Sequence, residues 1–202
     1  MNKINASAAI LIGGKSTRYG TDKAYLRLSD DPVSVHIYRM LVDVFPEVFF
    51  ISGKKRKEMT NGVVVLKDLH PDIGPLGGLA TALEHASHPA CFLTACDLPF
   101  IDRNVIAKLW DQTRDFDITV PKWNGLLEPM VCFYHKRCLP EVHRAINTGN
   151  YMLQGFWENL RVRYVDMHAH YPVKTLNRLF FNINTQADFQ QAMKLLHEQQ
   201  TE

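Results

Sequence analysis

Short apolar runs alternate with longer stretches in which apolar residues recur at helical spacing. Runs at 8–12, 48–52, 63–66 and 91–95 have the length of strands. Between them, Val33, Ile37, Leu41 and Val44 follow one another at intervals of three or four residues, and segments near 79–85 and 105–110 also predict helices. This alternation favours an α/β fold, in which a mostly parallel central sheet is covered by helices on both faces.

The second half of the chain predicts further elements of both kinds. A strand at 118–120, the turn signal Asn124-Gly125 and a β-like run at 130–134 indicate a hairpin. Residues 138–160 are expected to form two short helices separated near 148–150, and 162–165 and 179–183 are expected to be strands. Thr185 with Asp188 resembles a capping box that opens a final helix. With no repeat or low-complexity linker, residues 1–202 are expected to form one domain.

Composition excludes several classes of function. The chain is 46% hydrophobic and 22% charged, and 23 basic against 21 acidic residues give a net charge of +2, which argues against nucleic acid or an anionic membrane as a partner. No apolar run approaches the ~20 residues that span a membrane, and no signal-peptide pattern is seen, so a cytoplasmic location is expected.

The cysteine and histidine patterns do not predict a metal centre. The four cysteines form no C-x-x-C pair and are expected to be reduced and mostly buried. The closest histidine pairs, His168 with His170 and His85 with His88, lack a third ligand at suggestive spacing. The aromatic residues Tyr151, Phe156 and Trp157 are expected to be core.

The loop after the first predicted strand carries the first candidate chemistry. Two glycines, Gly13 and Gly14, end the strand, and Lys15, Arg18 and Lys23 follow within nine residues. Glycine allows backbone N–H groups to approach a ligand closely, and the cations suit phosphate oxygens. The stretch is not a P-loop, whose first glycine would fall on an alanine, and it is not a G-x-G-x-x-G fingerprint. Taken alone, it is equally consistent with a glycine-rich turn bearing solvated charges.

A second candidate lies at the end of the strand predicted at 91–95. Asp97 follows this strand and Pro99 stops its extension. A carboxylate at the carboxyl end of a strand is a suitable ligand for Mg²⁺ that also binds phosphates and water. The alternative is that Asp97 caps a turn before the helix near Asp102.

Taken together, these segments resemble the MobA family of molybdenum cofactor guanylyltransferases. The family pattern L-A-G-G-x-S-x-R-M-G-x-D-K compares with residues 11–23, which read LIGGKSTRYGTDK. The resemblance continues, in the family's order, through Asp68, Gly-Pro-Leu-Gly-Gly-Leu at 74–79, Cys-Asp-Leu-Pro at 96–99, Glu-Pro-Met at 128–130 and Asn-Ile-Asn-Thr at 182–185. It implies a Rossmann-like, three-layer nucleotidyltransferase fold of the GT-A kind.

The resemblance also implies a reaction and its site. GMP would pass from GTP to the terminal phosphate of Mo-molybdopterin with release of pyrophosphate, and Mg²⁺ would be the cofactor. Cofactor-handover proteins and molybdoenzymes are the implied partners. Arg18, Lys23 and Asp97 are implied as catalytic, with Asp97 also the metal ligand and Lys15 a weaker candidate. Leu11, Ile12, Gly13, Gly14, Lys23, Asp68 and Asp97 would bind the nucleotide, and Glu128, Asn182 and Asn184 the acceptor substrate.

Some alternatives stay open at this point. Glu128 is also consistent with a buried structural residue, and Asn184 with a turn before the last helix. Ile12 stands where the family has Ala, Tyr19 where it has Met, and Ser52-Gly53 where it often has Asn, which leaves the base specificity open. A molybdopterin cytidylyltransferase, a sugar-phosphate nucleotidyltransferase and a non-enzymatic nucleotide-binding adaptor are the rival functions.

Overall fold

The computed structural model describes residues 3–12, 26–28, 31–53 and 63–200 of the chain. Its strands are β1 (Ser7–Leu11), β2 (Glu47–Ser52), β3 (Val64–Lys67), β4 (Ala90–Ala95), β5 (Ile118–Trp123), β6 (Leu126–Leu127), β7 (Cys132–His135) and β8 (Val162–Asp166). Its helices are α1 (Val33–Val44), α2 (Pro75–His85), α3 (Arg103–Trp110), α4 (Leu139–Asn147), α5 (Val173–Leu179) and α6 (Gln186–Gln200), with short 3-10 turns at Lys136–Cys138 and Met167–Ala169.

The strands form one sheet in the order β3-β2-β1-β4-β7-β5-β6, with β8 paired to β5. The pairs joining β3, β2, β1 and β4 are parallel. Strand β7 is antiparallel to both β4 and β5, so β5 and its parallel partner β8 run in the direction of β4. The predicted mostly parallel sheet is therefore confirmed, with β7 and β6 as its antiparallel members.

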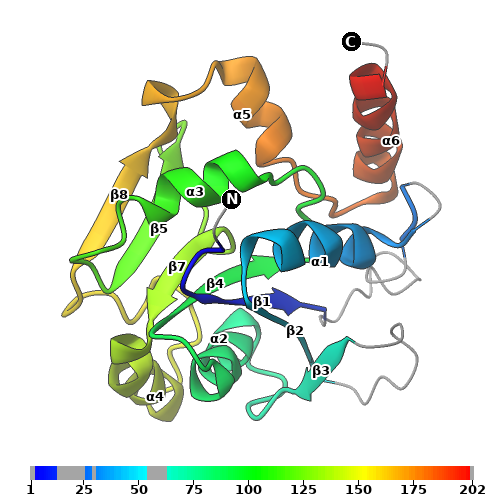
Figure 1. The fold of residues 1–202 in the computed structure, drawn as a ribbon. Coiled ribbons are helices and arrows are strands. Elements are labelled where there is room, and N and C mark those ends of the chain that lie inside the picture. Colours follow the sequence, from blue (N-terminus) through cyan, green and yellow to red (C-terminus); the bar gives the residue numbers. More distant parts are fainter. Residues whose placement is uncertain (1–2, 13–25, 29–30, 54–62, 201–202) are drawn as a thin grey trace.

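Helices cover both faces of this sheet, and Figure 1 shows α1, α3, α5 and α6 on the side opposite α2 and α4. Strand β1 shows why two cores form. Ala8 and Ile10 lie in a hydrophobic cluster with α1 and α3, whereas Ala9 and Leu11 lie in a second cluster with α2 and α4. Side chains alternate between the faces of a strand, so an uninterrupted apolar strand supplies both layers.

Two local predictions are confirmed by backbone geometry. Asn124 and Gly125 both have positive φ, at 46° and 76°, and join β5 to its antiparallel partner β6. At the start of α6, the Thr185 hydroxyl accepts from the N–H of Asp188, and Asp188 Oδ2 accepts from the N–H of Thr185 at 2.7 Å. This reciprocal cap is the one predicted from the sequence.

Two predicted elements in the second half are wrong. Only α4 forms within 138–160. Beyond it the chain turns through Gly149 at φ +74° and inserts Phe156 and Trp157 into the second cluster by separate turns rather than by a second helix. The two rings are core as expected, but Tyr151 is 45% exposed.

Residues 179–183 are not a strand. Val173–Leu179 is helical, a helix that the sequence reading missed, and its C-cap is Phe180. The apolar residues Leu179, Phe180 and Ile183 pack into the first cluster instead. A short apolar run does not distinguish a buried strand from other buried segments.

The expected state of the cysteines is confirmed. None of the four takes part in a disulfide bond, and Cys91, Cys132 and Cys138 are buried. Burial raises the pKa of the Cys138 thiol to about 12, so this group stays protonated near neutral pH.

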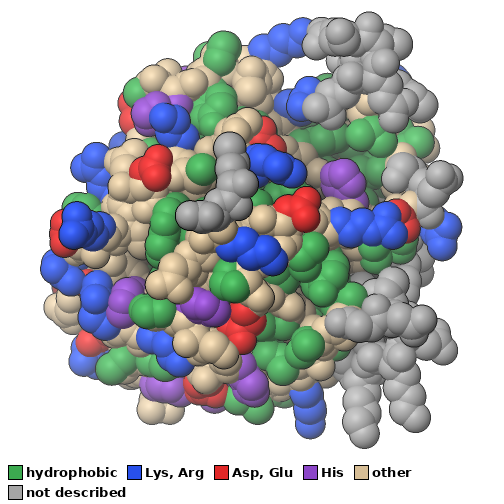
Figure 2. Space-filling model, viewed as in Figure 1, with side chains coloured by type: hydrophobic (Ala, Val, Ile, Leu, Met, Phe, Trp, Pro, Cys, Tyr) green, Lys and Arg blue, Asp and Glu red, His purple; other side chains and the backbone are tan. Residues whose placement is uncertain are grey.

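Among the described residues, no helix is both long and apolar enough to cross a bilayer. On the face shown in Figure 2, acidic and basic side chains of the described residues are interspersed.

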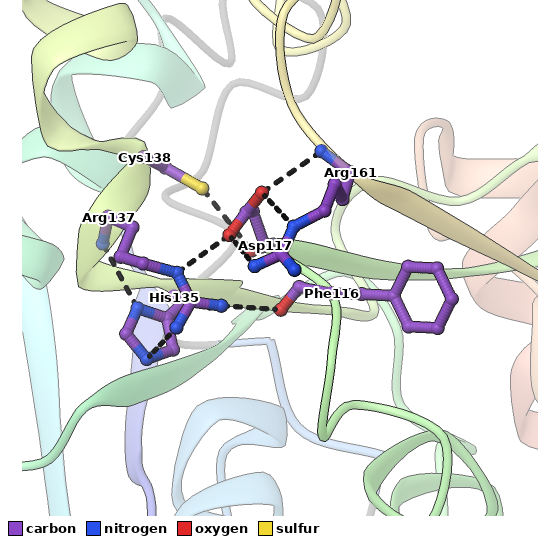
Figure 3. A network of polar contacts seen from close by, with 6 residues as sticks. All are labelled: Phe116, Asp117, His135, Arg137, Cys138 and Arg161. Atoms are coloured by element: carbon purple, nitrogen blue, oxygen red, sulfur yellow. Dashed lines mark hydrogen bonds and ion pairs between the residues drawn. The ribbon is translucent and has the colours of Figure 1, made fainter.

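A buried carboxylate joins three strands at their ends. Asp117 lies just before β5, and its side chain, 9% exposed, accepts from Arg137 Nε at 2.7 Å and from the backbone N–H of Arg161 at 3.0 Å (Figure 3). Burial by itself would raise the pKa of Asp117, but the hydrogen bonds from Arg161 and Arg137 outweigh it and lower this pKa to about 2. The network connects β5 to the end of β7 and the start of β8.

We expect Asp117→Asn to lower the free energy of unfolding by about 2 kcal/mol at pH 7, because charge-assisted hydrogen bonds are lost from a buried group. The folded pKa lies below the unfolded one, so this stabilisation is full above about pH 4 and is lost as the pH falls towards 2. Urea unfolding at pH 7 and at pH 3 measures both effects. An unchanged difference between the variant and wild type at the two pH values would contradict this assignment.

Candidate functional site

The carboxyl ends of β1, β2, β3 and β4 meet at one edge of the sheet. The Ile12 N–H donates to the Ile51 carbonyl at 3.0 Å, the Cys96 N–H to the Leu11 carbonyl at 3.2 Å, and the Asp68 N–H to the Ser52 carbonyl at 2.9 Å. These bonds continue the ladders just beyond the strands. In open α/β sheets this edge is where ligands bind.

Asp68 is held at this edge by two hydrogen bonds to one of its oxygens. Asp68 Oδ1 accepts from the backbone N–H of His70 at 2.9 Å and from the Thr81 hydroxyl at 3.0 Å. Thr81 lies on α2 and is fully buried, so the carboxylate is fixed relative to that helix. The sequence pattern gives no sign that Thr81 positions the Asp68 carboxylate.

Two glycines of α2 allow the helix to approach the loop and β1 closely. A Cβ on Gly77 would lie 2.2 Å from the His70 carbonyl oxygen, and one on Gly78 would lie 2.6 Å from a Leu11 methyl. The last two positions of the Gly-Pro-Leu-Gly-Gly segment therefore require glycine on steric grounds. The absence of side chains there lets the Asp68 loop and the end of β1 pack against α2.

Leu11 and Ile12 lie at the edge mainly through their backbone. The Ile12 side chain is fully buried in the first cluster and Leu11 is 9% exposed. Ile12, which stands where the family has alanine, is thus a residue of the hydrophobic core. The predicted contacts of these two residues with a nucleotide are therefore contacts of their backbone atoms.

Asp97 is brought next to a segment from the end of the chain. It follows β4 by two residues, and its carbonyl oxygen accepts from the Ile183 N–H at 2.9 Å. The helix that follows, α3, is capped by Asp102, whose carboxylate accepts from the N–H groups of Asn104 and Val105. Asp97 itself lies in the turn between β4 and this helix, so its alternative role in a turn stays open. Residues 182–184 thereby lie beside Asp97, which the sequence spacing alone did not place together.

Glu128 and Asn182 complete this group. The Asn182 side chain hydrogen-bonds the Glu128 carboxylate, and Asn182 Nδ2 also lies 3.4 Å from the Phe180 carbonyl. Burial raises the pKa of the Glu128 carboxyl and the nearby charge of Asp97 raises it further, against hydrogen bonds from Met130 and Asn182. Asp97 therefore lies close enough to Glu128 for its charge to disfavour the ionised form of Glu128.

The other predicted residues divide into two groups. Asn184 is exposed, and its N–H donates to Asp188 Oδ2 at 2.9 Å as part of the α6 cap. Its turn role is therefore present in the structure, while its binding role stays a prediction. The residues Gly13, Gly14, Lys15, Arg18 and Lys23 lie outside the described residues.

Comparisons with known proteins agree with this geometry. The model of the MobA-like NTP transferase domain matches residues 8–163. A protein of Clostridium perfringens (strain 13) named "Probable molybdenum cofactor guanylyltransferase" is 32% identical over 95% of this chain and 98% of its own length. A protein of Pelotomaculum thermopropionicum with the same name is 29% identical over 98% of this chain and 97% of its own.

A solved structure shares the fold. Molybdopterin-guanine dinucleotide biosynthesis protein A from Archaeoglobus fulgidus superposes with a TM-score of 0.82 at 24% identity, covering 95% of this chain and 99% of that one. The expected three-layer nucleotidyltransferase fold is thus confirmed.

We expect Gly77→Ala to destabilise the protein by about 1–3 kcal/mol, because the added methyl meets a backbone carbonyl that cannot rotate away. Gly53→Ala is the matched control, since a Cβ there meets nothing within 4 Å. Thermal unfolding of both variants measures the difference. Equal stability of the two variants would contradict the close approach of α2 to His70.

We expect Glu128→Gln to raise the free energy of unfolding at pH 8 in a chelating buffer. Most substitutions in proteins instead lower the free energy of unfolding, by about 1 kcal/mol. The amide keeps the shape and removes a charge that burial and Asp97 disfavour. The raised folded pKa means that the gain should shrink as the pH falls and Glu128 is protonated in both states. Urea unfolding compares it with Glu158→Gln, an exposed control; a loss of stability at pH 8 would argue against the opposition of Glu128 and Asp97.

Proposed function

Because the chain belongs to the family of MobA-like NTP transferase domains, we propose that it transfers GMP from GTP to the terminal phosphate of Mo-molybdopterin. The products are molybdopterin guanine dinucleotide and pyrophosphate. The observation that carries the proposal is the convergence of Asp97, Glu128 and Asn182 at the carboxyl edge of the sheet. That edge is where a nucleotide and its acceptor would lie together.

The chemistry explains why the site is rich in charge. An oxygen of the acceptor phosphate attacks the α-phosphorus of GTP, a new P–O bond forms, and the bond to the bridging oxygen of pyrophosphate breaks. The attacking oxygen is already anionic, so no strong general base is needed. The barrier comes from repulsion between anions and from charge that grows on the leaving group.

The carboxylates fit a magnesium ion. Asp97 supplies a hard oxygen ligand of the kind that Mg²⁺ prefers, and a cation beside it would offset the negative charge that helps to raise the pKa of Glu128. When bound there, Mg²⁺ would neutralise phosphate charge. Asp97 is the proposed ligand, and Asn182 orients the Glu128 carboxylate beside it.

The remaining roles complete the proposal. Arg18 and Lys23 offset the charge of the triphosphate, and the backbone at 11–14 contacts the nucleotide. Asp68 lies on the nucleoside side, held by Thr81. Glu128, Asn182 and Asn184 face the acceptor. Proteins that hand over the cofactor and molybdoenzymes that receive it are the proposed partners, in the cytoplasm.

We expect Asp97→Asn and Lys23→Ala each to lower turnover at least 100-fold, because each removes charge complementary to the reacting phosphates. Pyrophosphate release is measured with Mo-molybdopterin and each of the four nucleoside triphosphates. Asp111→Asn, an exposed carboxylate at the end of α3, is the control and should leave turnover unchanged.

Two results would overturn the proposal. Turnover with CTP but not GTP would make the protein a cytidylyltransferase. Nucleotide binding with no transfer to molybdopterin, from a protein that keeps its fold, would favour the sugar-phosphate or adaptor alternatives.

A further inference from the structure

A group of three side chains that are able to bind a metal ion lies between α2 and α4. His70 comes from the loop after β3, Glu84 from α2 and His143 from α4. Glu84 Oε1 lies 3.2 Å from His143 Nε2 and 3.8 Å from His70 Nε2. The three ligand atoms all lie within 4.8 Å of one another, although the residues are separated by up to 73 positions, from 70 to 143, in the sequence.

These separations are close to those of ligands around one metal ion. Bonds of 2.0–2.1 Å at tetrahedral angles place neighbouring ligand atoms about 3.3 Å apart. The distance from Glu84 to His143 already matches this value, and that from Glu84 to His70 exceeds it slightly. The imidazole rings meet edge to face at 69°, with centroids 6.0 Å apart, and in each ring Nε2 is the atom nearest Glu84 Oε1, at 3.8 Å for His70 and 3.2 Å for His143.

The backbone that carries the three side chains is firmly held. Leu83 and Val142, the neighbours of Glu84 and His143, are fully buried in the second cluster. The N–H of His70 donates to Asp68 Oδ1 at 2.9 Å, and its carbonyl lies against Gly77. Preorganised ligands on packed elements reduce the ordering cost of binding an ion.

We propose that His70, Glu84 and His143 bind a divalent transition-metal ion of the zinc class, with water completing the coordination. Two imidazoles and one carboxylate are a donor set that zinc accepts, whereas Mg²⁺ prefers oxygen ligands alone. The side chains are partly exposed, at 29%, 27% and 43% for His70, Glu84 and His143, so the ion can enter from solvent. A bound ion would tie the Asp68 loop to α2 and α4.

The test uses tag-free full-length protein stripped with a chelator and held in excess Mg²⁺. Zinc is titrated against a chromogenic competitor, and thermal unfolding is followed with and without zinc. Wild type should bind one zinc per chain and unfold at a higher temperature with the metal. His143→Gln and His70→Gln should each weaken zinc binding at least 10-fold and abolish the shift, because each removes one of three protein ligands.

Two controls keep the outcome decisive. His85→Gln, next to Glu84 on α2 but outside the cluster, should bind zinc like wild type, and so should Asp97→Asn. The two histidine variants act independently, so one that fails to fold leaves the other to decide. Three results would overturn the proposal: wild type that binds no stoichiometric zinc, folded histidine variants with unchanged zinc affinity, or an Asp97→Asn variant that loses zinc binding. If wild type binds no zinc, Glu84 and His143 form an ordinary ion pair.

Discussion

The burial of β1 on both faces and both edges is the constraint on which the rest of the structure depends. Strand β1 pairs in parallel with β2 on one side and β4 on the other, and its side chains alternate between two cores. A strand in this position must be apolar throughout, and the strands that pair with it in parallel run in the same direction. The ends of four parallel strands therefore meet at one edge, where the loops that follow them converge.

Charged groups are arranged differently at the two edges of the sheet. At the amino edge, charged and polar groups are paired: Asp117 with two arginines, and the Ser7 hydroxyl with Glu47 at the start of β1 and β2. At the carboxyl edge, burial and the nearby charge of Asp97 raise the pKa of Glu128. Perturbed carboxylates of the second kind occur often at functional sites.

A backbone hydrogen bond joins the last part of the chain to the candidate site. The Ile183 N–H donates to the Asp97 carbonyl oxygen, which brings Asn182 to Glu128, a residue of the hairpin region. This segment follows a helix that the apolar pattern did not reveal, and it runs into α6 through the Thr185 cap. The acceptor side of the proposed site thus depends on packing of residues 173–188 against the sheet.

The sequence by itself determined the elements whose signals are local: the apolar strands, the helical spacing of 33–44, the Asn124-Gly125 turn and the Thr185 cap. It also determined the family, because motif residues keep their order along the chain. Only the tertiary structure decided which distant residues meet. Asn182 with Glu128, Thr81 with Asp68, and His70 with Glu84 and His143 are contacts between separate elements. Spacing along a chain carries no information on such contacts, because they follow from strand order and helix packing, which minimise exposed apolar surface over the whole fold.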